Sequence, residues 1–141
     1  MKLNKSAIYM ALLALGSSAA LPSIAADNLA ALEVKQVGVV SYVSGGVGDD
    51  ERQQMDRLAA DYQLKMVFAG KGSPNEYLSG VKVQITDKDG KTVLDTVTQG
   101  PFLLAKMPAG RYAISAESEG MVKQQTVQVT GAKSQQVVFI W

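Results

Sequence analysis

Carboxylates are the side chains of this sequence that could do chemistry, because the chain contains neither His nor Cys. Without these two residue types, Ser-His-Asp and Cys-His nucleophile systems cannot be built, and neither can the usual zinc sites. Paired carboxylates can still serve as the acid and the base of a hydrolase. Two acidic clusters are available for such a role: Asp49-Asp50-Glu51, and Asp87 with Asp89.

The first cluster follows a glycine-rich turn, residues 44–48. This turn lacks the Lys and Ser/Thr of a phosphate-binding loop, and three adjacent carboxylates would repel a phosphate. A helix start explains the acids better, because a carboxylate can cap a helix and suits the positive end of its dipole. We therefore expect Asp49 or Asp50 to cap a helix. Hydrolysis by this cluster, Glu51 included, stays a further hypothesis.

The second cluster lies in the run Asp87-Lys88-Asp89-Gly90. Asp and Gly tolerate the left-handed backbone angles of a hairpin turn. The spacing also matches part of a calcium loop, but the Glu that an EF-hand requires downstream is missing at the right distance. The sequence therefore predicts a hairpin here, and we expect no metal site, no catalytic residue and no cofactor.

Short strands separated by Gly and Pro are predicted for the second half of the chain. Val81, Val83 and Ile85 alternate with polar residues, which is typical of a strand with one buried and one exposed face. Tyr112 and Ile114 begin the inward row of another. Evenly spaced strands of this kind favour a β-sandwich. The strands that we expect are 81–86, 92–97, 102–107, the strand of Tyr112, Ile114 and Ala116, 122–129 and 135–141.

The order of Gly and apolar residues in this half resembles the carboxypeptidase regulatory-like β-sandwich domains of exported bacterial proteins, also called transthyretin-like or prealbumin-like. The resemblance spans about Tyr77 to Val129. It implies a folding and interaction module rather than an activity, and the metal-binding residues of the associated carboxypeptidases are absent. The residues that match are Gly80, Val81, Val83, Gly90, Gly100, Phe102, Leu104, Pro108, Gly110 and Tyr112.

An amphipathic helix is predicted between two strands in residues 37–69. Met55, Leu58, Ala59 and Tyr62 fall at i, i+3, i+4 and i+7, so they form one apolar stripe. Strands are expected at 37–43 and 64–69. A segment this short buries little surface by itself, so we expect this strand–helix–strand unit to be attached to the sandwich.

The N-terminal residues have the features of a secretory signal peptide, predicted for residues 1–26. Lys2 and Lys5 precede the apolar run Ala7–Leu15, and small residues lead to cleavage after Ala25 or Ala26. The run is too short for a transmembrane anchor, which needs about 20 apolar residues. A flexible leader, 27–36, is expected next. The mature protein would then be periplasmic or secreted.

Removal of the signal peptide leaves 12 basic and 13 acidic residues, a formal charge of −1. A chain without a basic surplus gives no support to nucleic-acid binding. Residues 37–141 are of single-domain size, with 77–141 as the transthyretin-like core. The predicted fold class is mainly β: an Ig-like or transthyretin-like sandwich with one N-terminal helix.

These features favour a non-enzymatic module of the cell envelope. We expect it to bind another envelope protein through a sheet edge or through the loop 70–79. The alternative is a carbohydrate or small-ligand binder, because exposed aromatic rings can stack on sugars. Tyr77, with Asn75 nearby on the same loop, is then the candidate binding site, since loops carry function more often than cores do.

Overall fold

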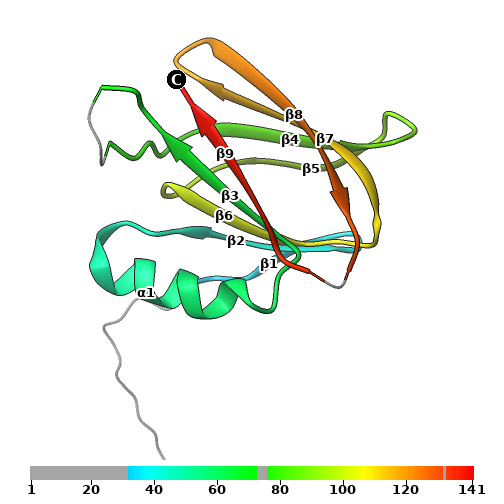
Figure 1. The fold of residues 1–141 in the computed structure, drawn as a ribbon, viewed down its shortest axis with the longest axis horizontal. Helices are drawn as coiled ribbons and strands as arrows, with labels where there is room; N and C mark the ends of the chain where they lie inside the picture. The colour runs from blue at the N-terminus through cyan, green and yellow to red at the C-terminus, as the bar shows by residue number, and fades with distance from the viewer. Residues whose placement is uncertain (1–31, 73–75, 132) are drawn as a thin grey trace, which may run out of the picture. The chain divides into compact units, whose positions relative to one another are not determined.

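The computed structural model describes residues 32–72, 76–131 and 133–141. The predicted signal peptide, the first part of the predicted leader and Asn75 lie outside these residues. The described residues form one helix and nine strands, which Figure 1 labels: β1 (Lys35–Val37), β2 (Val40–Gly45), α1 (Gly48–Ala59), β3 (Leu64–Ala69), β4 (Lys82–Asp87), β5 (Thr92–Val97), β6 (Phe102–Lys106), β7 (Gly110–Ser118), β8 (Met121–Val129) and β9 (Gln135–Ile140).

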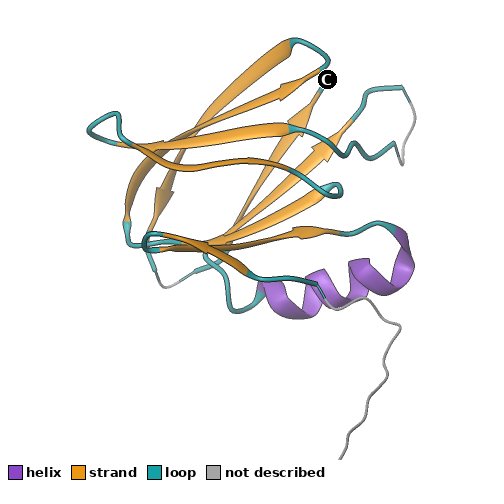
Figure 2. Ribbon diagram, turned by 180° about the vertical axis from the view of Figure 1, so that it is seen from behind, coloured by secondary structure: helices purple, strands orange, loops and turns teal. Residues whose placement is uncertain are grey.

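The strands form two sheets that pack face to face. One sheet has the order β1-β2-β6-β3-β9, and the other has the order β5-β4-β7-β8. The four-stranded sheet is antiparallel throughout, whereas the five-stranded sheet is mixed because β3 and β9 run parallel. Figures 1 and 2 show the two layers, with α1 against the five-stranded sheet. The predicted fold class, a mainly β sandwich with a single helix, is confirmed.

The main core lies between the two sheets and follows from the alternation of side chains along each strand. The four-stranded sheet contributes Val83 and Ile85 of β4 and Ile114 of β7, and these side chains are fully buried. Phe68 of β3 and Phe139 of β9 are directly opposite in the register, and their rings stack with centroids 5.8 Å apart. Such aromatic pairs stabilise a core beyond the area they bury, by about 1 kcal/mol.

A second, smaller core lies between α1 and the outer face of the five-stranded sheet. Its buried residues are Val43, Met55, Tyr62, Val67, Phe102 and Leu104. Because β6 is covered on one face by the sandwich core and on the other by this cluster, four of its five residues are buried. This explains why the sequence of β6 is continuously apolar where that of β4 alternates.

The predicted strand–helix–strand unit, 37–69, is part of the sandwich rather than an attachment to it. Strand β6 pairs with β2 on one side and with β3 on the other, so both strands are central members of the sheet. The strand expected at 37–43 was also wrong in its bounds. Gly38 has a φ of 58° and turns the chain, which makes β1 and β2 a hairpin. Lys35 and Gln36, which were predicted to belong to the flexible leader, are therefore part of a strand.

The hairpin predicted at Asp87-Lys88-Asp89-Gly90 joins β4 and β5. One carboxylate oxygen of Asp87, Oδ1, accepts hydrogen bonds from the main-chain N–H groups of Asp89 and Lys91, both at 2.9 Å. Gly90 has a φ of 82°, the left-handed conformation that Gly adopts without strain. The acidic cluster is therefore held in a turn by its own main chain. Among the described residues, no helix has the length and apolar character needed to span a membrane.

Candidate functional site

Tyr77, the predicted ligand-binding aromatic residue, is engaged by its neighbours. Its ring lies 5.6 Å from that of Phe102 between centroids, and the guanidinium carbon of Arg52 lies 5.0 Å from the Tyr77 centroid. The side chain is 39% exposed. Because helix α1 and strand β6 both contact this ring, Tyr77 anchors the segment that leads into β4 to the sheet. These contacts take up part of the ring surface on which a sugar would stack.

The predicted helix caps, Asp49 and Asp50, lie inside the first turn of α1 rather than at its start. Val47 occupies the N-cap position and makes no side-chain capping bond. Instead, Glu51 Oε1 accepts hydrogen bonds from the main-chain N–H groups of Gly46 and Val47, at 3.0 and 3.2 Å. The capping prediction was therefore wrong in its residues. Glu51 lies four residues after Val47, one position beyond the glutamate of a capping box, and the N-cap is not Ser or Thr, so no such motif marks it in the sequence.

Most residues that carry the family resemblance occupy positions that the fold itself requires, at turns, at a close main-chain contact or in the core. Gly80, Gly90 and Gly110 have positive φ angles. Gly100 packs so tightly that a Cβ atom there would lie 2.3 Å from the main-chain oxygen of Gly45. The apolar members of the set are buried, and they are Val81, Val83, Phe102, Leu104 and Tyr112.

Tyr112 closes the turn that precedes β7. Its hydroxyl donates a hydrogen bond of 2.7 Å to the main-chain oxygen of Pro108. Burial raises the pKa of this hydroxyl above its ordinary value of 10.0, and the Asp87 carboxylate raises it further. Burial likewise raises the pKa of the Tyr62 hydroxyl, with a smaller contribution from Asp61. Both shifts favour the neutral phenol, as expected of tyrosines in a core.

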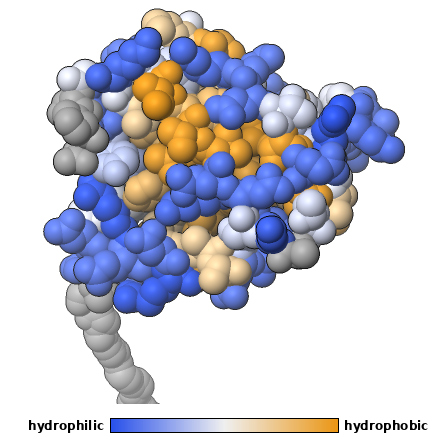
Figure 3. Space-filling model, in the orientation of Figure 1, coloured by the Kyte–Doolittle hydropathy of each residue, from blue (hydrophilic) through white to orange (hydrophobic). Residues whose placement is uncertain are grey.

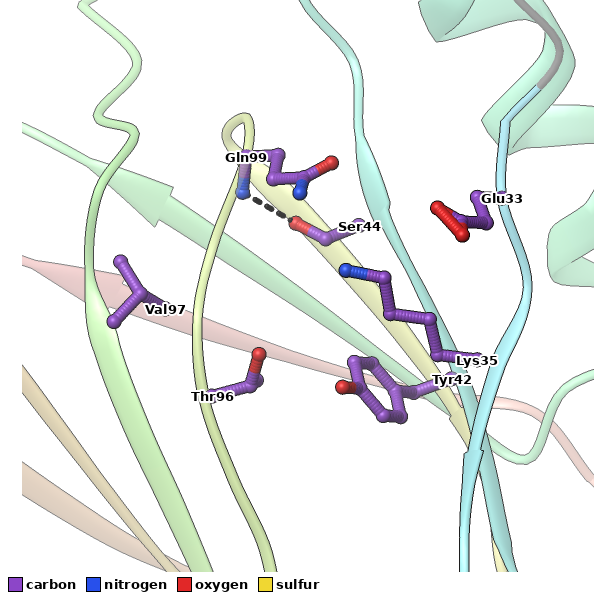
Figure 4. A pocket seen from close by; sticks show the side chains of 7 residues that line it. All are labelled: Glu33, Lys35, Tyr42, Ser44, Thr96, Val97 and Gln99. Carbon is purple, nitrogen blue, oxygen red and sulfur yellow. Dashed lines mark hydrogen bonds between the residues drawn. The ribbon is translucent and has the colours of Figure 1, made fainter.

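Within the described part of the chain, no group of three acidic side chains converges as a metal site would require. The small pocket of Figure 4 lies between the β1–β2 hairpin and β5. Its volume is about 10 Å³, roughly the space of one water molecule. Ser44 Oγ accepts a hydrogen bond from the Gln99 N–H at 2.8 Å and donates one to the Phe102 carbonyl. The pocket is therefore too small for a ligand.

A larger open groove of about 550 Å³ lies at one end of the sandwich. The β7–β8 turn forms one wall, and the segments that follow β3 and precede β4 form the other. Trp141 lines this groove together with Glu76, Glu119 and Lys71. Its indole Nε1 donates a hydrogen bond of 2.8 Å to the main-chain oxygen of Met121. The groove thus combines an aromatic ring with charged side chains and with the hydroxyl groups of Ser79 and Ser118.

The sheets end in four edge strands, β1, β9, β5 and β8. Strand β1 has only three residues, and β5 has a bulge at Val93, where the register with β4 shifts. Short edges and bulges are common protections against pairing with another chain. Strand β8 has neither protection, since it is nine residues long and keeps one register with β7 throughout.

The main-chain groups that β8 presents at this edge follow from the β7–β8 hairpin. Its two-residue turn, Glu119 and Gly120, makes Ser118 and Met121 the first hydrogen-bonded pair. Because antiparallel strands alternate between hydrogen-bonded and open positions, every second residue of β8 points its N–H and C=O away from β7. These outward residues are Val122, Gln124, Thr126 and Gln128.

Side chains connect the edges of β8 and β9, which belong to different sheets. Gln125 Nε2 donates a 2.7 Å hydrogen bond to the Val138 carbonyl, and Gln135 Nε2 donates one to the Gln128 carbonyl. The outward groups of Val122, Gln124 and Thr126 have no such partner among the described residues. We call these three residues the free segment of β8.

Two exposed apolar side chains lie at the start of the free segment: Met121 and Val122 are 55% and 53% exposed. Val138 and Ile140 of β9 are exposed as well, on the outer face of the five-stranded sheet, because Val137 and Phe139 face the core. Figure 3 shows apolar side chains gathered in the region of β8 and β9. A strand edge with unpaired main-chain groups beside apolar side chains is the arrangement to which an extended chain can add.

No family model matches this chain, and a comparison with curated proteins finds no match either. The fold and the site therefore define its class: a β-sandwich with one helix packed on its five-stranded sheet and one long, regular edge strand on the other sheet.

Proposed function

We propose that this protein is an exported, non-enzymatic interaction module of the cell envelope, and that it binds another polypeptide chain by adding an extended segment of it to the β8 edge. The observation that carries the proposal is the free segment. Three consecutive outward residues of an otherwise regular edge strand have no hydrogen-bond partner among the described residues.

Main-chain hydrogen bonds would supply the affinity of this interaction. On the exposed face of the sheet, an added strand would lie beside the side chains of Val122, Gln124 and Thr126, because these alternate with the side chains that face the core. Val122, Gln124 and Thr126 would therefore set the preference for the incoming residues. The other edges support the choice of β8, since β1 is short, β5 is bulged, and the shorter β9 already has its Val138 carbonyl bonded to Gln125.

The sequence supports the rest of the proposal. The features of residues 1–26 are typical of a signal peptide, which supports a mature protein in the periplasm or outside the cell. The resemblance to carboxypeptidase regulatory-like domains supports an accessory role, because it implies a folding and interaction module. The absence of His and Cys from the chain removes the commonest nucleophile systems.

Site-specific photo-cross-linking in the cell envelope tests this proposal. A benzoylphenylalanine placed at Gln124 should give a discrete adduct, whose mass identifies the bound chain. The matched control is Ala113 of β7, which lies in the same sheet between β4 and β8 and is not at an edge. Equal labelling from both positions, or no adduct from Gln124, would contradict the proposal.

The groove beside Trp141 favours a second candidate function, the binding of a carbohydrate. An indole ring can stack on the apolar face of a sugar, and the Glu76 and Glu119 carboxylates could accept hydrogen bonds from its hydroxyls. Screening on a glycan array should then show binding that Trp141→Ala loses and Tyr77→Ala retains. Binding by neither the wild type nor the variants would exclude this function.

A further inference from the structure

We infer that the chain added to β8 is the β8 strand of a second copy of this protein, in antiparallel register about a two-fold axis through Gln124. The inference rests on the proposed function for the assignment of β8 as the pairing edge. It adds the identity of the partner and the register of the pairing.

The first argument is the symmetry of the free segment. It is bounded on one side by the β7–β8 turn and on the other by Gln128, whose carbonyl already accepts a hydrogen bond from Gln135. Gln124 lies at its centre. A two-fold axis through Gln124 places Val122 of each copy opposite Thr126 of the other, so the set of free groups is mapped onto itself.

This register uses every free group once. Each residue of the free segment offers one N–H and one C=O, so three residues in each of two copies make six main-chain hydrogen bonds. A shift of two residues in one direction would place Val122 opposite Gln128, whose carbonyl already accepts a hydrogen bond, and a shift in the other direction would place Thr126 opposite Gly120 of the turn. The centred register is therefore the one that satisfies the edge.

The side chains are compatible with this register on both faces of the sheet. On the outer face, Val122 lies opposite Thr126, and β-branched residues pair well across strands. The Gln124 side chains of the two copies lie opposite each other, where their amides can exchange hydrogen bonds. The pairing would also cover Val122, which is 53% exposed in the single chain.

The charge on β8 does not oppose self-pairing in this register. Lys123 is the only charged residue of β8. In the centred register it lies opposite Gln125 of the second copy, so no like charges face each other across the new pair. Like charges directly opposite each other destabilise a strand pair, and this register avoids that arrangement. The helix is not involved, since α1 packs on the other sheet. The product is a dimer with one continuous eight-stranded sheet.

Sedimentation of the purified protein over a dilution series measures the association, and a pair of proline variants tests its location. Proline has no N–H and is tolerated at edge positions whose N–H points outward. Gln124→Pro should therefore keep the fold and abolish the dimer. Gln136→Pro makes the same change on the β9 edge, where the N–H also points away from the neighbouring strand, and should leave the dimer intact.

Cross-linking tests the register, because the natural chain has no cysteine to interfere. Cysteines placed at Gln124 would face each other in the dimer and should react with a short bis-maleimide. Cysteines placed at Gln128 would be eight residues apart along the paired strands, about 27 Å, and should not react.

The outcomes separate this inference from the proposed function. A wild-type protein that stays monomeric, while the photo-cross-linker at Gln124 captures a different chain, would overturn the inference and leave the function in place. A dimer that forms equally with Gln124→Pro, or that cross-links at Gln128 and not at Gln124, would also overturn it. A monomer without any adduct at Gln124 would overturn both.

Discussion

The indole of Trp141 and the main chain of Met121 connect the two sheets of the sandwich. Trp141 Nε1 donates a 2.8 Å hydrogen bond to the Met121 carbonyl, which joins the end of β9 to the start of β8. The same ring stacks on Phe139, with centroids 6.1 Å apart. Gln125 and Gln135 make the other connections between these strands. Side chains thus hold the β8 and β9 edges in place without main-chain pairing between them.

The Trp141→Phe substitution should destabilise the protein by about 1 kcal/mol, because it removes the hydrogen bond to Met121 while it keeps an aromatic ring in the stack. Urea unfolding followed by circular dichroism measures this change. Tyr77→Phe is the control, since the Tyr77 hydroxyl makes no hydrogen bond among the described residues. An equal loss in both variants would show that the Trp141 bond does not contribute.

The Gly100→Ala substitution should destabilise the protein more strongly, by about 3 kcal/mol. The new Cβ would lie 2.3 Å from the Gly45 oxygen, and main-chain atoms cannot move aside without disturbing β2. Gly131→Ala is the matched control. Gly131 has a φ of 83° and no atom within 4 Å of the added Cβ, so only the backbone strain of about 1 kcal/mol should appear. Similar losses in the two variants would contradict the close contact.

The strands of the second half could be predicted from the sequence because their signals are local. Alternation in Val81, Val83 and Ile85 and the turn residues at Gly90 each act within a few residues of the chain. The order of the strands depends on contacts between distant segments. The insertion of β6 between β2 and β3 joins residues about 60 positions apart, and no local pattern encodes it. Gly38 was a local signal, and it divides the expected first strand.

The candidate site was less predictable than the fold for the same reason. The prediction named a sheet edge, but it could not say which strand would be the edge before the strand order was known. Tyr77 was singled out by its position in a loop. Its contacts with Arg52 and Phe102, 25 residues away in each direction, occupy the ring and could not be inferred from the sequence.

Glu51 should contribute more to stability than either of its acidic neighbours. Glu51→Ala removes the acceptor of two main-chain N–H groups, those of Gly46 and Val47, and should cost about 1 kcal/mol. Asp50→Ala removes only a favourable charge near the positive end of the helix dipole, a few tenths of a kcal/mol. Urea unfolding of the two variants checks this order. A larger loss for Asp50→Ala would restore the aspartate as the cap.

The stability of the protein should fall as the pH rises above about 10, because of Tyr62 and Tyr112. Burial raises the pKa of both hydroxyls above 10.0 in the folded chain. In the unfolded chain they ionise near their ordinary pKa, so the folded state holds more protons in the range between the two values. In that range the free energy of unfolding therefore falls with each unit of pH. Below about pH 10 the stabilisation from the two tyrosines is fully present.

The double variant Tyr62→Phe and Tyr112→Phe isolates this effect. Loss of the Tyr112 bond to the Pro108 carbonyl should lower its stability at neutral pH by about 1 kcal/mol. Its stability should nevertheless decline less steeply than that of the wild type in alkaline solution, since neither ring can ionise. The slope of the unfolding free energy against pH is therefore the informative quantity. Parallel slopes in the two proteins would mean that other groups govern the alkaline unfolding.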